Sequence, residues 1–153
     1  KEEPEAIFIL GATDFNLRGH YMWSETLGLT IQLEHSFLRF FTNTAHTGVR
    51  IGPRVSPKGK GLMGWTVFPF FIMGRTVLTS GTYALASWSV LGAGAELNYT
   101  HRWRSVLLEG GVGVYRTENI GYTTYADSME GTVAPDVLIG IKPVLTLGVG
   151  YAF

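Results

Sequence analysis

The sequence has 153 residues, enough for one closed sheet but too few for two independent hydrophobic cores. Charged residues make up 16% of it, against about 25% in an average soluble domain. The formal net charge is zero and cysteine is absent, which argues against a nucleic-acid partner, a disulfide framework, a thiolate metal site and a thiol nucleophile. We therefore expect a single domain spanning residues 1–153.

No stretch of the sequence is long and apolar enough to cross a membrane as a helix. The most apolar run, residues 62–74, is shorter than the roughly 18 residues that a span needs, and it contains Pro69. Since only helices and closed barrels satisfy their backbone polar groups within lipid, a glycine-rich apolar chain of this kind favours a β-barrel. Residues 1–5 lack the pattern of a signal peptide, and we expect them to begin the mature chain.

Alternation of apolar and polar residues predicts strands along the chain, because successive side chains of a strand point to opposite faces. In the first half the expected strands are residues 5–13, 16–23, 26–41 and 45–55. Their expected connections are residues 14–16, a tight turn near Ser24, residues 42–44 and the glycine- and lysine-rich turn 56–61.

The second half of the chain predicts four more strands, at residues 62–77, 83–99, 106–116 and 137–153. Residues 62–77 are apolar on both faces, so the sequence does not say which face points inward. A bulge is expected near Ser89 and Val90. Residues 78–82 are expected to form a loop, residues 100–105 a short basic turn and residues 117–134 a long irregular stretch.

The last predicted strand ends in the pattern Thr146-x-Gly148-x-x-Tyr151-x-Phe153. This pattern resembles the C-terminal β-signal of bacterial outer-membrane β-barrels, which combines a polar residue, a glycine, an aromatic residue and a terminal phenylalanine. The resemblance implies recognition by the barrel-assembly machinery of the outer membrane. The alternative interpretation is the closing strand of a soluble β-barrel or sandwich.

Pro143 is the residue that fits this last strand least well, because proline removes a donor from the hydrogen-bond ladder. It marks either a bulge or, together with Lys142, a hairpin turn. The hairpin would add a ninth strand and spoil the even strand number of outer-membrane barrels.

Together these segments predict an all-β fold, a closed antiparallel eight-stranded transmembrane β-barrel. The whole chain resembles the OmpA/OmpX class of small outer-membrane barrels, through its alternation, its closing Tyr-x-Phe and the stretch of residues 107–115. The resemblance implies that the short turns near Ser24, Ser56 and His101 are periplasmic. It also implies location in the outer membrane of a Gram-negative-type bacterium.

One face of the predicted strands carries a balanced set of polar side chains among small residues. Its members are Arg18, Gln32, Glu34, Arg50, Arg54, Glu96, Asn98 and Glu109. Matched charges suit an enclosed lumen, where ions must pair, and an eight-stranded barrel is just wide enough inside for side chains to fill it. We therefore expect a lumen polar network that plugs the barrel.

Aromatic residues lie largely toward the ends of the predicted strands. They are Tyr21, Trp23, Trp65, Trp88, Tyr99, Trp103, Tyr151 and Phe153. Such residues form girdles at the two membrane–water interfaces of transmembrane barrels, so this distribution predicts that the apolar face meets lipid.

Some barrels of this class modify lipid A, which makes the histidines worth weighing as general bases. An acyl hydrolase or transferase needs a serine, a histidine and an orienting acid close together. The set nearest in sequence is Asp14, His20 and Ser24, but Ser24 is expected at the periplasmic end. His46 could instead pair with residues of neighbouring loops, namely Ser80, Asp127 or Ser128. A histidine hydrogen-bonded in the lumen or at the rim is the simpler interpretation, and no catalytic residue is assigned.

Ligands and partners are less clearly indicated. The four histidines are scattered, so neither a metal nor a cofactor is expected. The basic turn of residues 102–104 could touch anionic headgroups. Residues 119–130, with Tyr122 and Tyr125, are the best candidate for contact with a protein partner or a surface polysaccharide.

The leading interpretation is a non-catalytic integral outer-membrane barrel that acts as a scaffold, adhesion or accessory protein. Its expected partners are outer-membrane lipid, lipopolysaccharide and the barrel-assembly machinery. The alternatives are a membrane-embedded lipid A acyl hydrolase or transferase and, third, a narrow pore.

Overall fold

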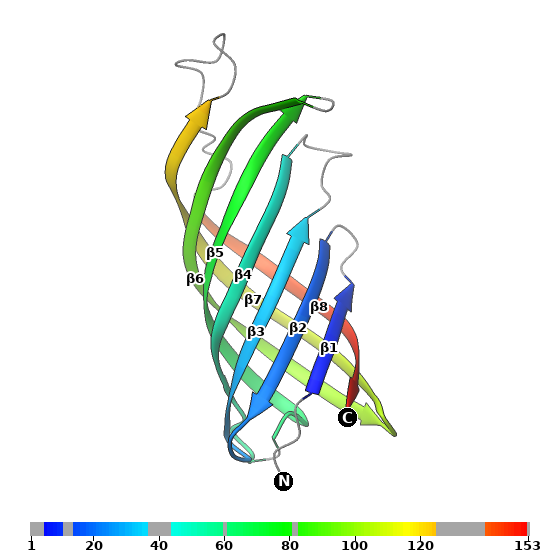
Figure 1. Ribbon diagram of the computed structural model, residues 1–153. Coiled ribbons are helices and arrows are strands. Elements are labelled where there is room, and N and C mark those ends of the chain that lie inside the picture. Colours follow the sequence, from blue (N-terminus) through cyan, green and yellow to red (C-terminus); the bar gives the residue numbers. More distant parts are fainter. Residues whose placement is uncertain are drawn as a thin grey trace.

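The computed structural model describes residues 5–10, 14–36, 44–59, 61–80, 83–124 and 140–152. Within these ranges the chain forms eight strands, β1 (Glu5–Leu10), β2 (Asp14–Met22), β3 (Leu27–Ser36), β4 (Thr44–Val55), β5 (Gly64–Ser80), β6 (Tyr83–Trp103), β7 (Val106–Thr124) and β8 (Gly140–Ala152). Each strand pairs antiparallel with the next, and β8 pairs with β1, so that the sheet closes into a barrel (Figure 1). None of the described segments is a helix with the length and apolarity needed to span a membrane.

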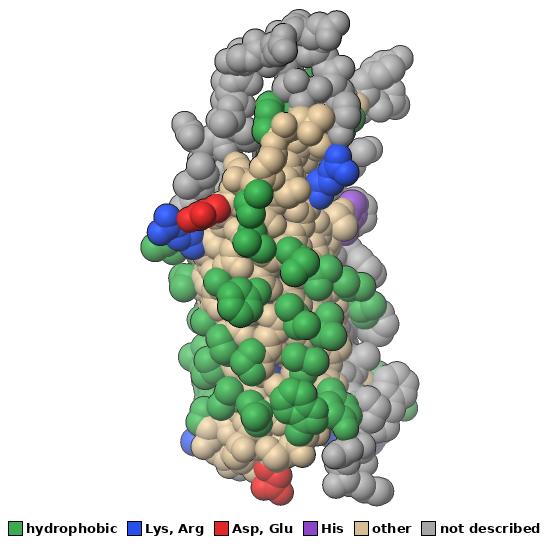
Figure 2. Space-filling view, turned by 60° about the vertical axis from the view of Figure 1, so that its left-hand side comes forward, with side chains coloured by type: hydrophobic (Ala, Val, Ile, Leu, Met, Phe, Trp, Pro, Cys, Tyr) green, Lys and Arg blue, Asp and Glu red, His purple; other side chains and the backbone are tan. Residues whose placement is uncertain are grey.

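The barrel is polar inside and apolar outside. Ile141 and Leu145 of β8 are 77% and 74% exposed, and other large apolar side chains point outward from β2 to β7. Figure 2 shows hydrophobic side chains spread over the middle of the wall, with charged side chains mainly above and below them. The buried residues include arginines and glutamates. This polarity is that of a transmembrane barrel, whose wall meets lipid, and is the reverse of a soluble barrel.

Strands β5, β6 and β7 are longer than the sequence predicted. Residues 78–80 lie in β5, β6 continues to Trp103, and β7 runs on to Thr124, so the predicted loop 78–82, basic turn 100–105 and irregular stretch 117–134 were each partly wrong. The predicted connection at residues 14–16 was also wrong, because β2 begins at Asp14. Residues 78–80 and 117–124 have the composition of a loop, but they extend β5 and β7 because β6 lies between these strands and pairs with both. As a result these three strands rise above β1–β4 as one wall (Figure 1).

The ambiguous segment 62–77 takes a definite phase in the barrel. Phe68, Phe70 and Ile72 are buried inside, whereas Phe71 and Met73 are exposed on the outer wall. The β6–β7 register shifts between Trp88 and Ser89, so a bulge lies at the predicted place, but its extra residue, Gly121, belongs to β7 and not to β6.

Strand β8 runs through Pro143 without interruption. Pro143 lies opposite Val114 in an unbroken β7–β8 register, so the hairpin alternative was wrong and no bulge occurs in this pairing. Among the described residues, β1 pairs with β8 only between Gly148 and Ala152. Pro143 lies outside this described β1–β8 pairing, so its missing donor removes no hydrogen bond from it.

Backbone hydrogen bonds close the short turns at the lower end of the barrel and link one turn to the next. The amides of Trp23 and Ser24 donate to the Leu27 carbonyl at 3.0 and 3.1 Å, which closes the predicted tight turn. The Ser56 amide donates to the Thr26 carbonyl at 2.8 Å and links this turn to the next. Exposed aromatic side chains lie near these turns, including an edge-to-face pair of Trp65 and Tyr99 with ring centroids 5.1 Å apart.

Candidate functional site

Arg18 of β2 is the centre of the lumen and is completely buried. Its Nε donates to Gln32 Oε1 at 2.7 Å, its Nη1 to Glu109 Oε1 at 2.6 Å and its Nη2 to Glu96 Oε2 at 2.7 Å. These partners come from β3, β7 and β6, so one guanidinium joins opposite sides of the barrel. The planar fork of arginine suits such a role, because each of its nitrogens presents a donor in a fixed direction.

A chain of contacts leads from Arg18 toward the upper mouth. Glu96 Oε1 accepts a hydrogen bond from Arg50 Nη1 at 2.9 Å, and Arg50 Nε forms an ion pair with Glu34 Oε2 at 2.7 Å. The other oxygen of Glu34 lies 3.1 Å from His46 Nε2. His46 Nδ1 lies 3.0 Å from the hydroxyl of Thr76. Charges of opposite sign alternate along this branch.

A second chain of contacts leads from Arg18 toward the lower end. Glu109 accepts from Arg18 with one oxygen and pairs with Arg54 Nη2 through the other. Arg54 Nη1 lies 3.1 Å from His20 Nε2, and His20 Nδ1 lies 2.8 Å from Thr30 Oγ1. Because a guanidinium has only donors, Arg54 donates in its contact with the His20 ring. We call the two branches together, from His46 to Thr30, the lumen network.

The inner face of β5 supplies aromatic rings for the arginines of the lumen network. The guanidinium carbon of Arg18 lies 5.3 Å from the ring centroid of Phe68, and that of Arg50 lies 5.0 Å from Phe70 and 5.2 Å from Tyr115. Arginine stacks favourably on aromatic faces, most strongly where water is excluded. These contacts explain why the segment 62–77 is apolar on both faces.

Glycines on the inner face make room for the large polar side chains. A Cβ at Gly111 would lie 2.0 Å from Asn98 Oδ1, and a Cβ at Gly48 would lie 2.8 Å from His46 Nε2. A Cβ at Gly74 would meet the same imidazole at 2.7 Å. The histidine ring thus lies over Gly48 and Gly74, which lets it reach Glu34. Large and small residues alternate as the narrow interior requires.

All eight residues predicted for the lumen are buried inside the barrel. Seven of them join the lumen network, whereas the side-chain nitrogen and oxygen of Asn98 have no hydrogen-bond partner in the described part of the chain. The predicted set did not include several other residues that bond within the lumen, among them His46, His20, Thr30, Thr76 and Thr100, the last of which donates to Glu109 Oε2 at 3.0 Å. These residues lie on the same faces of their strands as the predicted lumen residues, and this alternation was the signal that could have identified them.

The residues of the predicted barrel-assembly signal occupy both faces of β8. Thr146 points inward and donates to Glu96 Oε2 at 3.3 Å. Gly148 lies opposite Glu109, and Tyr151 is exposed opposite Val106. Phe153 lies outside the described residues. Thr146 therefore also belongs to the packing of the lumen, a role that the sequence pattern did not suggest.

The candidate catalytic sets are not assembled as predicted. Asp14 begins β2 and Ser24 lies in the turn beyond the other end of that strand, so the two do not form a site with His20. Of the partners considered for His46, Asp127 and Ser128 are outside the described residues, and Ser80 is the last residue of β5. His46 instead contacts Glu34 and Thr76, and Thr76 is 3% exposed. Within the described ranges, no three histidine, aspartate or glutamate side chains gather as metal ligands.

Trp88 was predicted for an interfacial girdle, and this prediction was wrong. It is buried on the inner face of β6 and stacks with Tyr122 of β7, with ring centroids 6.1 Å apart and an interplanar angle of 25°. Ala86, Val90 and Leu78 pack around it. The sequence shows only that Trp88 lies near a strand end. The β6–β7 pairing above the barrel decides which way it points.

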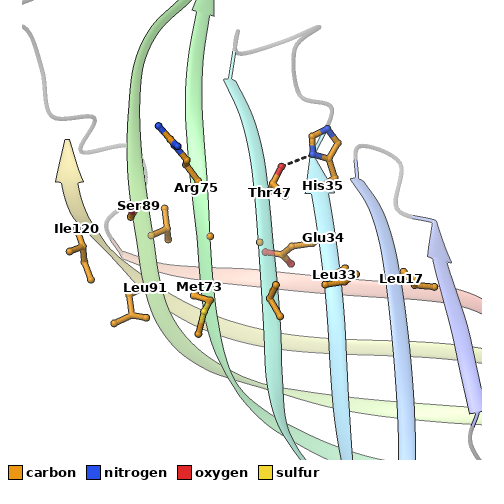
Figure 3. Close-up of a pocket in the computed structure, with 14 residues that line it drawn as sticks. Leu17, Leu33, Glu34, His35, Thr47, Met73, Arg75, Ser89, Leu91 and Ile120 are labelled. Carbon is orange, nitrogen blue, oxygen red and sulfur yellow. Dashed lines mark hydrogen bonds between the residues drawn. The ribbon is translucent and has the colours of Figure 1, made fainter. Parts of the chain in front are cut away.

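The outer wall carries a groove of about 730 Å³ across β2 to β7 (Figure 3). Its lower part is lined by apolar side chains such as Leu33, Met73 and Leu91, and polar ones form its upper edge. There His35 Nδ1 lies 2.7 Å from Thr47 Oγ1, and Arg75 Nη2 donates to Ser87 Oγ at 2.8 Å. The ten residues from Trp65 to Arg75 (75 − 65) rise about 25 Å along a strand tilted by about 40°, the height of the apolar band in such barrels.

A closed barrel with an apolar wall and an ion-paired lumen defines a class, the small transmembrane β-barrels of the outer-membrane type. Solved structures of this class are similar along the whole chain. CarO2 of Acinetobacter baumannii has a TM-score of 0.55 and 12% identity, with 100% of both chains covered. The Yersinia pestis outer-membrane protein Ail, determined in a phospholipid bilayer nanodisc, has a TM-score of 0.53 and 13% identity, with 99% of both chains covered.

These similarities confirm the predicted fold class. The Yersinia pestis structure is that of an outer-membrane protein, and the present chain has the same kind of fold. No family model and no curated protein matches the sequence. At 12–13% identity the similarity concerns the fold, so function must be argued from the residues of this chain.

Proposed function

We propose that the chain is a non-catalytic outer-membrane barrel whose lumen is sealed by its own side chains, and that it acts as a scaffold, adhesion or accessory protein through its outer rim. The single observation that supports this most strongly is the lumen network. It runs from His46 near the upper mouth through Arg18 to Thr30 near the lower end, across strands on opposite sides of the barrel.

The energy of the buried pairs supports a sealed lumen. Removing one partner of a buried ion pair typically costs about 3–5 kcal/mol, because the other charge stays buried without compensation. An ion that crossed the lumen would have to separate several such pairs, including Arg18 from Glu96 and from Glu109. Transient opening by thermal motion is therefore rare, and the barrel suits structural support and surface contact better than transport.

Planar-bilayer recording tests the seal. The refolded barrel is expected to show no steady open conductance, under conditions in which a trimeric porin added to the same bilayer does. A steady conductance of the wild-type barrel would contradict the sealed lumen and favour the narrow pore.

Lipid A hydrolysis is the second candidate, because Glu34, His46 and Thr76 have the order of an acid, a base and a hydroxyl nucleophile. Two observations weigh against it. The Thr76 hydroxyl is buried beneath its neighbours, and the Glu34 carboxylate is also engaged by Arg50. This arrangement supports a hydrogen-bonded cap on the lumen network.

A mass spectrum of lipid A from outer membranes with and without the protein separates these functions. We expect identical spectra. A species shifted by one acyl chain, lost in both His46→Ala and Thr76→Val, would make the chain an enzyme and overturn the non-catalytic proposal.

The outer wall supports contact with membrane lipid as part of the same proposal. The groove below His35 and Arg75 has the shape and apolar lining for acyl chains, with a guanidinium at the height of the outer headgroups (Figure 3). Lipopolysaccharide carries phosphate at that height. Arg75→Gln should lower the amount of lipopolysaccharide that copurifies with the barrel, whereas Arg102→Gln at the lower end of β6 should not.

A further inference from the structure

Four inward-facing residues form a row across β4 to β7, and two of them, His46 and Thr76, are the upper end of the lumen network. His46 lies opposite Thr76, Thr76 opposite Trp88, and Trp88 opposite Tyr122. We call these four residues the mouth row. Its β4–β5 half is polar and its β6–β7 half is aromatic.

In the aromatic half of the mouth row, the Trp88 ring is buried and the Tyr122 ring is partly exposed. Trp88 is 4% exposed and is fixed by an apolar cluster that includes Val90 and Leu78. Tyr122 stacks on it but is itself 42% exposed. The Tyr122 ring is therefore held in a defined orientation and still offers surface to a ligand.

A β-bulge turns Tyr122 toward the inside. The register pairs Ser89 with Ile120 and Trp88 with Tyr122, which leaves Gly121 as the extra residue of β7. Gly121 has φ +68°, a left-handed conformation that glycine adopts without strain. Without this extra residue the period of two would point Tyr122 outward, away from Trp88. Bulges that redirect a side chain are common beside binding sites.

Polar atoms without partners lie beside the two rings. Trp88 Nε1 and Asn119 Oδ1 are buried and have no hydrogen-bond partner in the described part of the chain. Asn119 lies opposite Val90, next to Trp88 on the inner face. Buried donors and acceptors are nearly always satisfied, so these two atoms indicate that a ligand or water completes them.

The aromatic half of the mouth row stands above the membrane. Tyr122 lies 16 residues along β7 from Val106 (122 − 106), a rise of about 40 Å for a strand tilted by about 40°, against about 25 Å for the apolar band. The longest separation between consecutive strands, from β7 to β8, is at this end, and the longer loops of barrels of this class are the outer ones. A ligand of the mouth row therefore comes from outside the cell.

We propose that the mouth row binds a pyranose ring at the end of a cell-surface glycan. Tyr122 offers a flat apolar face to the ring, and Trp88 Nε1 and Asn119 Oδ1 are the unpaired polar atoms beside it that its hydroxyls would satisfy. An apolar ligand would leave these polar atoms unpaired, which costs free energy. The proposal rests on the outer rim being the functional surface of a sealed barrel.

The test is a titration of the barrel refolded in a zwitterionic detergent that contains no sugar. The probes are maltose, cellobiose and lactose, and the core oligosaccharide released from lipopolysaccharide by mild acid. Calorimetry should show millimolar binding of at least one probe. Binding of the core oligosaccharide alone would identify lipopolysaccharide as the source, and binding of the disaccharides alone would identify a neutral glycan.

Two variants and one control locate the site. Tyr122→Ala should weaken binding about tenfold through loss of the stacked ring, and Trp88→Phe should weaken it several-fold because the ring stays and the N–H is lost. Tyr99→Ala, which removes an exposed tyrosine paired with Trp65 on the lower wall, should leave the dissociation constant unchanged. A heat-dependent gel shift verifies that each variant is folded.

The proposal is overturned if the folded wild-type barrel binds none of the probes, or if Tyr99→Ala weakens binding as much as Tyr122→Ala. Bilayer recording on the same samples keeps the two proposals apart. A closed barrel that binds no sugar contradicts the glycan site alone, whereas an open conductance contradicts the sealed lumen alone.

Discussion

The lumen and the outer wall of this barrel are built from alternate residues of the same strands, yet they follow opposite rules. On β7, Glu109 is 3% exposed and bonded to two arginines, whereas its neighbour Leu108 is 45% exposed. Inside, a charge is tolerable only with its partner. Outside, an apolar side chain needs no particular partner, because lipid supplies its contacts. The lumen therefore requires particular side chains at particular positions, whereas the wall requires only that its side chains be apolar.

The two regions differ in their free volume as well. Gly111 faces the crowded lumen, where an added Cβ would meet Asn98, whereas at the adjacent Gly110 the nearest atom is 3.8 Å away on Leu147. Gly111 thus faces the lumen and the adjacent Gly110 faces the outer wall. Matched substitutions on the two faces are the most direct way to test the contrast.

The largest effect is expected for Glu109→Gln. The change leaves Arg18 and Arg54 buried against a neutral amide, and it should lower the free energy of unfolding by about 3–5 kcal/mol. Urea unfolding of the barrel refolded in lipid vesicles, followed by tryptophan fluorescence, measures it.

Glu118→Gln is the matched control, because Glu118 pairs with Arg116 at 3.6 Å with both side chains about 70% exposed (71% and 67%). This change should alter stability by less than about 1 kcal/mol. Equal losses in the two variants would remove the distinction between lumen and wall charges.

The next effect is expected for a charge placed on the wall. Leu145 lies six residues from Tyr151 (151 − 145), near the middle of the apolar band, and Leu145→Arg should cost about 2–4 kcal/mol in lipid vesicles. Leu145→Met keeps the side chain apolar and should be nearly neutral. If Leu145→Arg were as stable as wild type in vesicles, this part of the wall would not face hydrocarbon.

A smaller effect is expected for Gly111→Ala, at about 1–3 kcal/mol of destabilisation through overpacking against Asn98. Gly110→Ala should be neutral or slightly stabilising, because alanine restricts the unfolded chain more than glycine does. Comparison of the two urea midpoints checks this pair. A loss at Gly110 equal to that at Gly111 would show that the effect comes from the backbone and not from lumen packing.

The smallest effect on stability is expected at the aromatic half of the mouth row, which lies above both regions. Tyr122→Ala removes one stacked ring from a half-exposed position and should cost about 1 kcal/mol in the same unfolding assay. A loss as large as that of Glu109→Gln would make Tyr122 a structural element of the barrel.

Much of the fold could be predicted, because alternation is a local property. Each of the eight strands occurs close to its predicted residues, and the charged phase on Arg18, Glu96 and Glu109 was recognised from the period of two alone. The strand ends were less predictable. Residues 117–124 have a loop-like composition, and β7 extends through them only because β6 is there to pair with.

The candidate sites depended on neighbours that lie far apart in the sequence. His46 was singled out as a possible base, but its contacts with Glu34 and Thr76 follow from the register of β3, β4 and β5. The pairing of Trp88 with Tyr122 requires the bulge at Gly121, which shifts the phase of β7 by one residue. A local pattern cannot show such a shift, because it exists only relative to the neighbouring strand.

The sequence by itself therefore determined that the chain is a barrel with an apolar wall and a charged interior, since the period of two and the balance of charges act residue by residue. Only the tertiary structure decided which charges pair, which face of residues 62–77 points inward and where Trp88 and Tyr122 meet. Closure of the sheet fixes the register of every strand against its neighbours, and the register places each buried side chain opposite its partner.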